Sequence, residues 1–178
     1  MRNPAQVPAI TIRTDPFVYP ERAASLTTIR FSDLKYKLGN EWIPLKNGRY
    51  SYKGVPYGGL DADLDDVWLF DKKGEDPQYA LVSISVVRYG GSSSPEGYVL
   101  LFAIRNGRLV RLQQLTYDAQ APGTGAKFDS SKSTLTVIER SNEGAPNCCP
   151  SHVDVVTYSW TGKLFQRATF EVRAVQSK

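Results

Sequence analysis

Apolar and polar residues alternate with a period of two over several stretches of the chain, which is the pattern of half-buried β-strands. In residues 79–87, YALVSISVV, the even-numbered positions are apolar, whereas Ser83 and Ser85 fall on the other face. Residues 98–104, YVLLFAI, are apolar at every position. This second run predicts a strand in the middle of a sheet or sandwich, buried on both faces.

Turn signals separate the strand-like stretches. Asn47-Gly48, Asn106-Gly107 and Thr161-Gly162 each lie between two of them, and Asn-Gly is the strongest short signal for a hairpin. We therefore expect residues 98–104 and 108–117 to form a tight antiparallel hairpin around Asn106-Gly107.

The fold class follows from these patterns. No stretch has a sustained period of 3.6 residues, and no alternation of strands and helices indicates a parallel sheet. The sequence predicts an all-β, strand-dominated fold of mostly antiparallel hairpins, either a sandwich or a twisted, partly closed sheet. At most one or two short helices are expected, for instance within residues 20–25, PERAAS, or 31–38, FSDLKYKL.

Domain organisation follows from length and proline content. The chain has 178 residues, of which 41% are hydrophobic, and this is typical of one folded domain. The first 25 residues contain four prolines and little periodicity. We expect an extended N-terminal arm over residues 1–25 and a single antiparallel β domain over residues 26–178.

Charge limits the classes of partner. The net charge is +4 and the isoelectric point is near 9.0, but lysine and arginine form no run, so we expect no nucleic-acid partner. No apolar run approaches the roughly 18 residues that a membrane span needs. The N-terminus also lacks the apolar core of a signal peptide. The sequence predicts no transmembrane segment in this chain.

The one concentrated charge is acidic, in residues 61–80, and raises the question of a calcium site. Asp61, Asp63, Asp65 and Asp71 carry the oxygen ligands that calcium prefers. A helix-loop-helix calcium loop starting at Asp61 would need glycine at its sixth position and glutamate at its twelfth, and this chain has Asp66 and Lys72 at those two positions. We therefore favour a solvated turn over a calcium site.

The only two cysteines are adjacent and are followed closely by the only histidine, in PNCCPSH, residues 146–152. A thiol of Cys148 or Cys149 beside His152 would suit nucleophilic catalysis, although Pro150 disfavours the local helix that would bring them together. Metal binding is a second alternative, but adjacent cysteines lack the usual spacing of zinc ligands. A strained disulfide between neighbours and two reduced, packed thiols are the remaining alternatives. No cofactor is expected.

The C-terminal third resembles a known family. The stretch NCCPSHVDVVTYSWTGKLF is similar to the Cys-Cys-Pro-Ser motif and following Trp-x-Gly strand of the LppP/LprE-like lipoproteins of mycobacteria and related exported bacterial proteins. The matching positions are Cys148, Cys149, Pro150, Ser151, Tyr158, Trp160, Gly162 and Phe165. The resemblance implies an extracytoplasmic location, periplasmic or at the cell surface, and a signal or anchor segment that this chain lacks. It implies no activity.

For an exported chain we favour a disulfide between Cys148 and Cys149 that stiffens the loop formed with Pro150, Ser151 and His152. Ten tyrosines and three tryptophans suit recognition of a sugar, a peptide or a neighbouring protein. The expected function is a non-catalytic, ligand- or partner-binding β domain of the cell envelope. The alternatives are a thiol-dependent enzyme and a redox-sensitive switch, both using this loop.

The disulfide is testable by intact mass with and without alkylation, in the absence of reductant. We expect the oxidised monomer to lack two hydrogens and to take up no iodoacetamide, because both thiols are consumed by the bond. A Cys148→Ser variant is the control and should take up one carbamidomethyl group at Cys149. Two carbamidomethyl groups on the unreduced wild-type chain would exclude the disulfide.

Overall fold

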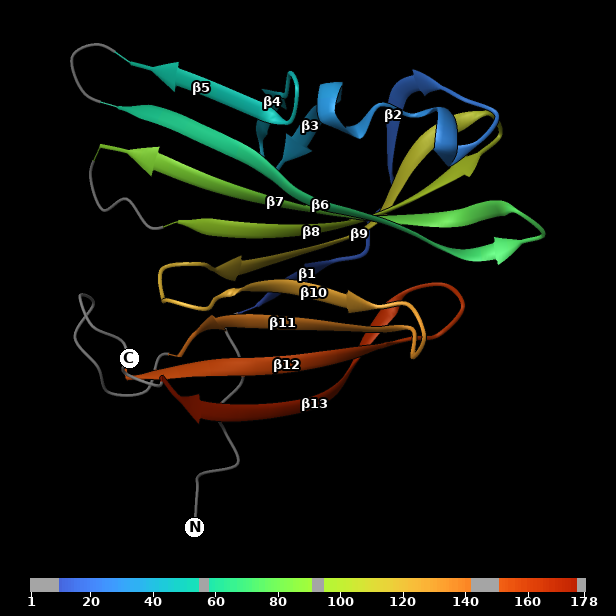
Figure 1. Cartoon of the computed structure of the whole chain (residues 1–178). Coiled ribbons are helices and arrows are strands. Elements are labelled where there is room, and N and C mark those ends of the chain that lie inside the picture. The colour runs from blue at the N-terminus through green and yellow to red at the C-terminus, as the bar shows by residue number, and fades with distance from the viewer. Residues whose placement is uncertain (1–9, 55–57, 91–94, 142–150, 176–178) are drawn as a thin grey trace. The chain divides into compact units, whose positions relative to one another are not determined.

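The computed structural model describes residues 10–54, 58–90, 95–141 and 151–175 (Figure 1). Within these ranges the regular elements are β-strands and two three-residue 3-10 helices, with no α-helix. All strand pairs whose register is resolved are antiparallel. The predicted all-β class, with antiparallel hairpins and at most two short helices, is confirmed.

The chain divides into two compact units. The larger, which we call the N-terminal unit, comprises Ile12–Thr116. The C-terminal unit comprises Tyr117–Lys178 together with the start of the chain to Thr11. This division into compact units does not test the expectation of one β domain over residues 26–178, which stays a prediction.

A seven-stranded sheet accounts for most of the N-terminal unit, in the order β1-β9-β8-β7-β6-β5, with β2 also paired to β9 (Figure 1). Its elements are β1 (Thr11–Arg13), β2 (Phe17–Arg22), β5 (Arg49–Lys53), β6 (Gly59–Lys73), β7 (Asp76–Tyr89), β8 (Glu96–Arg105) and β9 (Arg108–Asp118). β5 is therefore an edge strand, and this position matters for the site described below.

The predicted strand patterns are confirmed in β7 and β8. The even-numbered residues 80–86 of β7 are fully buried, as the period of two requires. All residues from 97 to 103 of β8 are buried, and β8 lies between β7 and β9. A strand that is apolar on both faces thus takes a central place in the sheet, as predicted.

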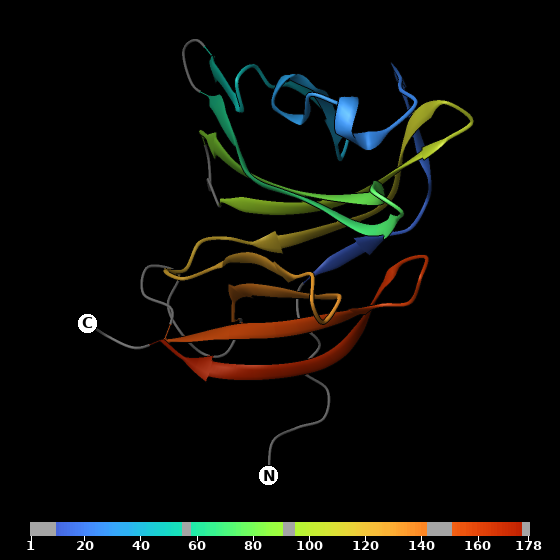
Figure 2. The ribbon, with the colours of Figure 1, turned by 45° about the vertical axis from the view of Figure 1, so that its right-hand side comes forward.

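A second layer packs on one face of this sheet (Figure 2). It consists of two 3-10 helices, η1 (Leu26–Thr28) and η2 (Phe31–Asp33), followed by the two-stranded ribbon of β3 (Lys35–Leu38) and β4 (Glu41–Pro44). The sequence predicts at most one or two short helices, for instance within residues 20–25 or 31–38. Of these two ranges, only Phe31–Asp33 is helical. Tyr36 and Leu38 alternate with lysines and are fully buried as residues of strand β3, so the helix does not continue.

Phe102 of β8 lies at the centre of the core between the two layers. Its ring contacts those of Tyr19, Phe31 and Tyr36, with centroid separations of 5.4, 6.0 and 6.2 Å. Offset and edge-on aromatic contacts of this kind add to the stability that burial alone provides. The residues that precede the 3-10 helices are thus held to the sheet through Tyr19, which is fully buried and lies within the expected N-terminal arm.

Two of the predicted turns have the backbone that a tight hairpin needs. Asn47 and Gly48 have φ of 52° and 80°, and Asn106 and Gly107 have φ of 51° and 71°. Positive φ at both central positions gives the turn whose twist matches that of paired strands, and asparagine and glycine tolerate it best. Asn106-Gly107 joins β8 to β9 as predicted.

The C-terminal unit contains a four-stranded sheet in the order β10-β11-β12-β13. Its strands are β10 (Gly125–Asp129), β11 (Thr134–Arg140), β12 (His152–Trp160) and β13 (Phe165–Ala174). Val156 and Tyr158 of β12 are fully buried and Trp160 is half-buried. Phe165 is buried against Trp160 and Phe128, with ring centroids 5.2 and 5.9 Å away.

The central role of Phe102 is testable by urea denaturation. Phe102→Ala should lower the free energy of unfolding by about 3–5 kcal/mol, because it removes a fully buried ring and its aromatic neighbours cannot fill the cavity. Val18→Ala is the control and should change it by less than about 0.5 kcal/mol, since Val18 is 53% exposed. Equal effects of the two substitutions would contradict this description of the core.

Candidate functional site

The cysteine loop lies only partly within the described structure. Cys148, Cys149 and Pro150 fall outside the described residues, so their roles stay predictions. Ser151 is exposed, and its Oγ lies 2.9 Å from Nδ1 of His152, the first residue of β12. The backbone of both residues is held by the unit: the Ser151 carbonyl accepts from the Val175 N–H at 2.8 Å.

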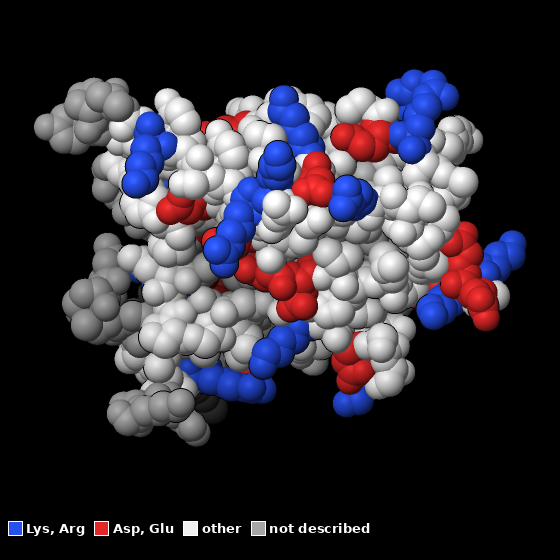
Figure 3. All heavy atoms as spheres, turned by 45° about the horizontal axis from the view of Figure 1, so that its top comes forward, with Lys and Arg blue, Asp and Glu red and all other residues white. Residues whose placement is uncertain are grey.

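The aspartates considered for calcium all lie on β6, but they are not gathered into one site. Asp61 accepts a hydrogen bond from the Tyr89 hydroxyl at 2.6 Å, and Asp63 pairs with Arg49 at 3.1 Å. Hydrogen bonds from Ser51 and Tyr89 lower the pKa of Asp61. On the face shown in Figure 3, acidic side chains likewise lie next to basic ones.

Asp65 and Asp71 are likewise not gathered into a calcium site with the other aspartates. The register of β6 and β7 shifts between Leu64 and Asp66, so Asp65 is the extra residue of a β-bulge. Its carboxylate accepts from Ser85 at 2.9 Å, and burial raises its pKa. Asp71 is ten residues beyond Asp61, roughly 30 Å along a strand. Among the described residues, no three His, Cys, Asp or Glu side chains lie close enough to hold a metal ion.

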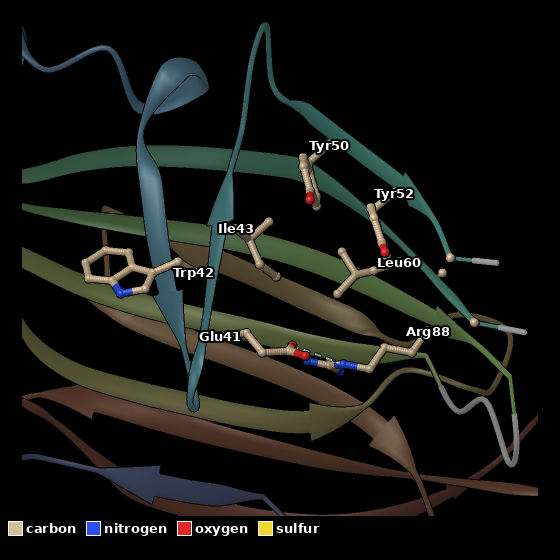
Figure 4. A pocket seen from close by; sticks show the side chains of 10 residues that line it. Glu41, Trp42, Ile43, Tyr50, Tyr52, Leu60 and Arg88 are labelled. Atoms are coloured by element: carbon tan, nitrogen blue, oxygen red, sulfur yellow. Dashed lines mark hydrogen bonds and ion pairs between the residues drawn. The ribbon is translucent and has the colours of Figure 1, made fainter.

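A groove in the N-terminal unit lies between β4 and β5 and has a volume of about 520 Å³ (Figure 4). Figure 4 shows the ribbon of β3 and β4 on one side and the tyrosines of β5 on the other, with Leu60 and Arg88 between them. The described residues that line it are Glu41, Trp42, Ile43, Tyr50, Tyr52, Gly54, Gly58, Gly59, Leu60 and Arg88. We call this hollow the β4–β5 groove.

The groove exists because β4 and β5 begin as a hairpin and then separate. The Lys46 N–H donates to the Arg49 carbonyl at 2.9 Å, and the Arg49 N–H donates back at 3.1 Å, around the Asn47-Gly48 turn. Continuing this ladder would pair Pro44 with Ser51 and Trp42 with Lys53. Neither pairing is made: β4 pairs with β3, and β5 pairs with β6.

The alternation of hydrogen bonds along β4 and β5 shows which backbone groups do not bond to the neighbouring strands β3 and β6. The Leu45 N–H donates to Leu34, so along β4 residues 41 and 43 bond to β3 and residue 42 points away from it. The Gly54 N–H donates to Gly58, so along β5 residues 50 and 52 bond to β6. The N–H and C=O groups of Trp42 therefore point away from β3, and those of Ser51 and Lys53 point away from β6. In a continued β4–β5 hairpin these groups would bond to one another.

Pro44 gives a sequence reason for the separation. It occupies the first ladder position after the Lys46–Arg49 bridge and has no N–H to donate to Ser51. Its φ is fixed, and proline is tolerated at a strand edge because the missing donor costs no ladder bond there. The hairpin is thus weakened at the point where β4 leaves β5.

The inner surface of the groove is mainly apolar and aromatic. Ile43 from β4 and Leu60 from β6 approach each other across it, and Tyr50 and Tyr52 project from β5 (Figure 4). Tyr50 is half-buried against the core, whereas Tyr52 is 57% exposed. Gly59 allows β5 to approach closely, since a Cβ there would lie 2.8 Å from the Tyr52 carbonyl oxygen.

One end of the groove is formed by an ion-paired arginine. Arg88 of β7 bonds to Glu41 at 2.7 Å, and its other terminal nitrogen bonds to Glu96. The Tyr98 hydroxyl also donates to Glu96, at 2.6 Å. Burial alone would lower the pKa of Arg88, but its hydrogen bonds to Glu41, Tyr98 and Glu96 outweigh this and raise it. The charge of Arg88 is therefore balanced within the unit.

Trp42 points to the other side of the β3–β4 ribbon and contributes its backbone to the groove (Figure 4). Its ring lies 5.4 Å from Nζ of Lys35 and 5.7 Å from Nζ of Lys37, within the range of cation–π attraction. These contacts hold the Trp42 side chain on the outer face of the ribbon.

The sequence contains no direct indication of this groove. Its residues come from β4, β5, β6 and β7, and their approach depends on pairings distant in the sequence. Two local signals were present: the Asn47-Gly48 turn with Pro44 three residues before it, and the tyrosines spaced by two in RYSYK, residues 49–53.

No family model, curated protein or solved structure matches the chain. No helix in the described parts of the chain is long and apolar enough to cross a membrane.

The Arg88 network predicts the titration of Tyr98. Burial and the hydrogen bond to Glu96 raise the pKa of Tyr98 to about 12. Because this exceeds the ordinary value of 10.0, the hydroxyl stabilises the fold fully below pH 10, and the contribution is lost as the pH rises through about 12. Carbon-13 NMR of the tyrosine Cζ should show this late titration.

Glu96→Gln should lower the pKa of Tyr98, because the acceptor loses its negative charge. Glu75→Gln, an exposed acid at the β6–β7 turn, is the control and should leave it unchanged. A Tyr98 that titrates near 10 in the wild-type chain would show that the hydroxyl is not held as described.

Proposed function

We propose that this chain is a non-catalytic ligand-binding domain of the cell envelope and that the β4–β5 groove is its binding surface. The observation that carries the proposal is the groove itself: about 520 Å³, walled by Ile43, Leu60, Tyr50 and Tyr52, with a charge pair at one end. Small-ligand and peptide sites are typically concave and mainly apolar, with a few polar groups that fix orientation.

The composition of the lining favours binding over catalysis. Among its described residues there is no Ser, Cys, His or Lys to act as a nucleophile, and the acid and base present bind each other. Arg88 is held by two carboxylates, Glu41 and Glu96. General acid–base work needs a group whose pKa lies near the working pH, and the pKa of Arg88 is moved away from that range.

The envelope location rests on the resemblance of residues 148–165 to exported lipoproteins. That part of the chain belongs to the C-terminal unit, whereas the groove belongs to the N-terminal unit. The two parts of the proposal are therefore independent, and binding at the groove does not require the disulfide.

NMR titration of the nitrogen-15-labelled chain tests the binding surface. The probes are indole, the trimer of N-acetylglucosamine, and the acetylated and amidated pentapeptide Ser-Val-Thr-Val-Ser. We expect at least one probe to shift the amides of Tyr52, Gly59 and Leu60 in a saturable way. Tyr52→Ala should weaken that binding about fivefold or more, because exposed aromatics at such sites contribute above roughly 1 kcal/mol.

Leu69→Ala is the matched control: Leu69 is 37% exposed on the same strand as Leu60 and does not line the groove. It should leave the affinity unchanged. If none of the three probes shifts the groove amides, or if the shifts are spread evenly over the surface, the groove is not a binding site.

A further inference from the structure

The hydrogen-bonding groups that remain available on the groove lining define the chemistry of a ligand more closely than the shape of the groove does. Nε and Nη2 of Arg88 both donate to one oxygen of Glu41, Oε2, at 3.3 and 2.7 Å. The other oxygen, Oε1, accepts no hydrogen bond from the described residues, and the Glu41 side chain is 53% exposed. The groove therefore keeps a carboxylate acceptor that the ion pair does not use.

Two tyrosines add hydroxyl groups and rings to this lining. Tyr50 and Tyr52 project from β5 toward Leu60 and Arg88 (Figure 4). Within the described part of the chain, neither hydroxyl bonds to another residue. A tyrosine hydroxyl both donates and accepts. Donors, acceptors and aromatic rings thus share one groove.

From these groups we infer that the ligand of the groove is a neutral oligosaccharide of β-linked rings in the glucose configuration. This inference rests on the proposed function and specifies its ligand. Tyr52 packs against the face of one sugar ring, and Glu41 accepts hydrogen bonds from the hydroxyls at the edge of that ring.

The ion pair selects an uncharged ligand that is rich in hydroxyls. Arg88 already binds two carboxylates, Glu41 and Glu96, so an anionic ligand would have to displace one of them. A cationic ligand would compete with Arg88 for Glu41, and those two groups are already 2.7 Å apart. A hydroxyl donates to Oε1 of Glu41 without separating the pair. Hydrogen bonds to a charged acceptor are about twice as strong as neutral ones, so this contact contributes to affinity.

The exposed ring of Tyr52 selects a ligand with an apolar face. Its side chain belongs to a residue that is 57% exposed, and it lines the groove. A sugar ring whose hydroxyls are all equatorial turns C–H groups to both of its faces and hydroxyls to its edge. The negative face of an aromatic ring attracts such C–H groups. The glucose configuration meets this requirement.

The spacing of the tyrosines favours a chain of sugar rings over a single ring. Tyr50 and Tyr52 are two residues apart on β5, about 7 Å along the strand. Each tyrosine therefore contacts a different ring of a chain that lies along β5. β-linkage keeps such a chain extended, whereas α-linkage coils it.

The same lining disfavours the other two probes. Indole has a single donor and would cover the carboxylate and the tyrosine hydroxyls without bonding to most of them, which is costly. An extended peptide binds by pairing with a strand edge. The N–H and C=O groups of Ser51 and Lys53 lie on the edge of β5 that faces away from β6, and neither residue lines the groove.

Two glucose trimers that differ only in linkage test the inference on the wild-type chain. Cellotriose is β-linked and maltotriose is α-linked. In an NMR titration, cellotriose and the trimer of N-acetylglucosamine should shift the amides of Tyr52, Gly59 and Leu60 in a saturable way. Maltotriose should bind at least about tenfold more weakly. The ring protons of bound cellotriose should move upfield, because the face of an aromatic ring shields protons above it.

Substitutions at two positions assign the groups that bind. Glu41→Gln keeps the size of the side chain and removes its charge, so it should weaken cellotriose binding on the order of tenfold. Glu75→Gln is the matched control: it removes the same charge from an exposed turn that does not line the groove, and it should leave the affinity unchanged. Tyr52→Phe keeps the ring and should lose less affinity than Tyr52→Ala. Circular dichroism and the amide spectrum of each variant confirm that it is folded.

The contrary outcomes are distinguishable. If indole or the pentapeptide shifts the groove amides and neither β-linked trimer does, the groove is a binding site but its ligand is not a saccharide. If maltotriose binds as tightly as cellotriose, or if Glu41→Gln binds cellotriose as the wild type does, the inferred recognition by Tyr52 and Glu41 is wrong. If no probe binds, the proposed function fails as well.

Discussion

The structure of the N-terminal unit depends on the consecutive strands β4 and β5, which are joined by a tight turn but do not pair with each other beyond it. Asn47-Gly48 reverses the chain with φ of 52° and 80°, and a single bridge between Lys46 and Arg49 follows. Beyond that bridge β4 joins β3 in the second layer, and β5 joins the edge of the seven-stranded sheet. The separation leaves N–H and C=O groups of Trp42, Ser51 and Lys53 without the ladder partners that a continued hairpin would supply.

The groove opens where β4 has left β5, and Leu60 and Arg88 lie between the two strands (Figure 4). Its side chains alone, two tyrosines and two aliphatic residues with a closed ion pair, would fit many small neutral ligands. The N–H and C=O groups of Ser51 and Lys53 lie on the edge of β5 that faces away from β6, and neither residue lines the groove. Arg88 is bonded to both Glu41 and Glu96, so its positive charge is balanced by carboxylates of the same unit.

The sequence was informative where structure is local and periodic. The period of two in residues 79–87, the fully apolar run at 98–104 and the Asn-Gly turns predicted β7, β8 and their hairpins, because burial and φ act on neighbouring residues. The groove could not be predicted in this way, because it arises where β4 and β5 pair with β3 and β6 and not with each other. The Cys148–Cys149 loop drew attention because rare residues are conspicuous, yet it lies outside the described structure.

Hydrogen exchange of individual backbone amides tests most directly whether the edges of β4 and β5 are open. The alternation of the ladders predicts slow exchange at Tyr50, Tyr52 and Ile43, whose N–H groups bond to neighbouring strands, and fast exchange at Trp42, Ser51 and Lys53. Equal protection of both sets would mean that β4 and β5 are paired with each other or with another segment in solution. The central claim would then be contradicted, because β4 and β5 would not separate after the Lys46–Arg49 bridge.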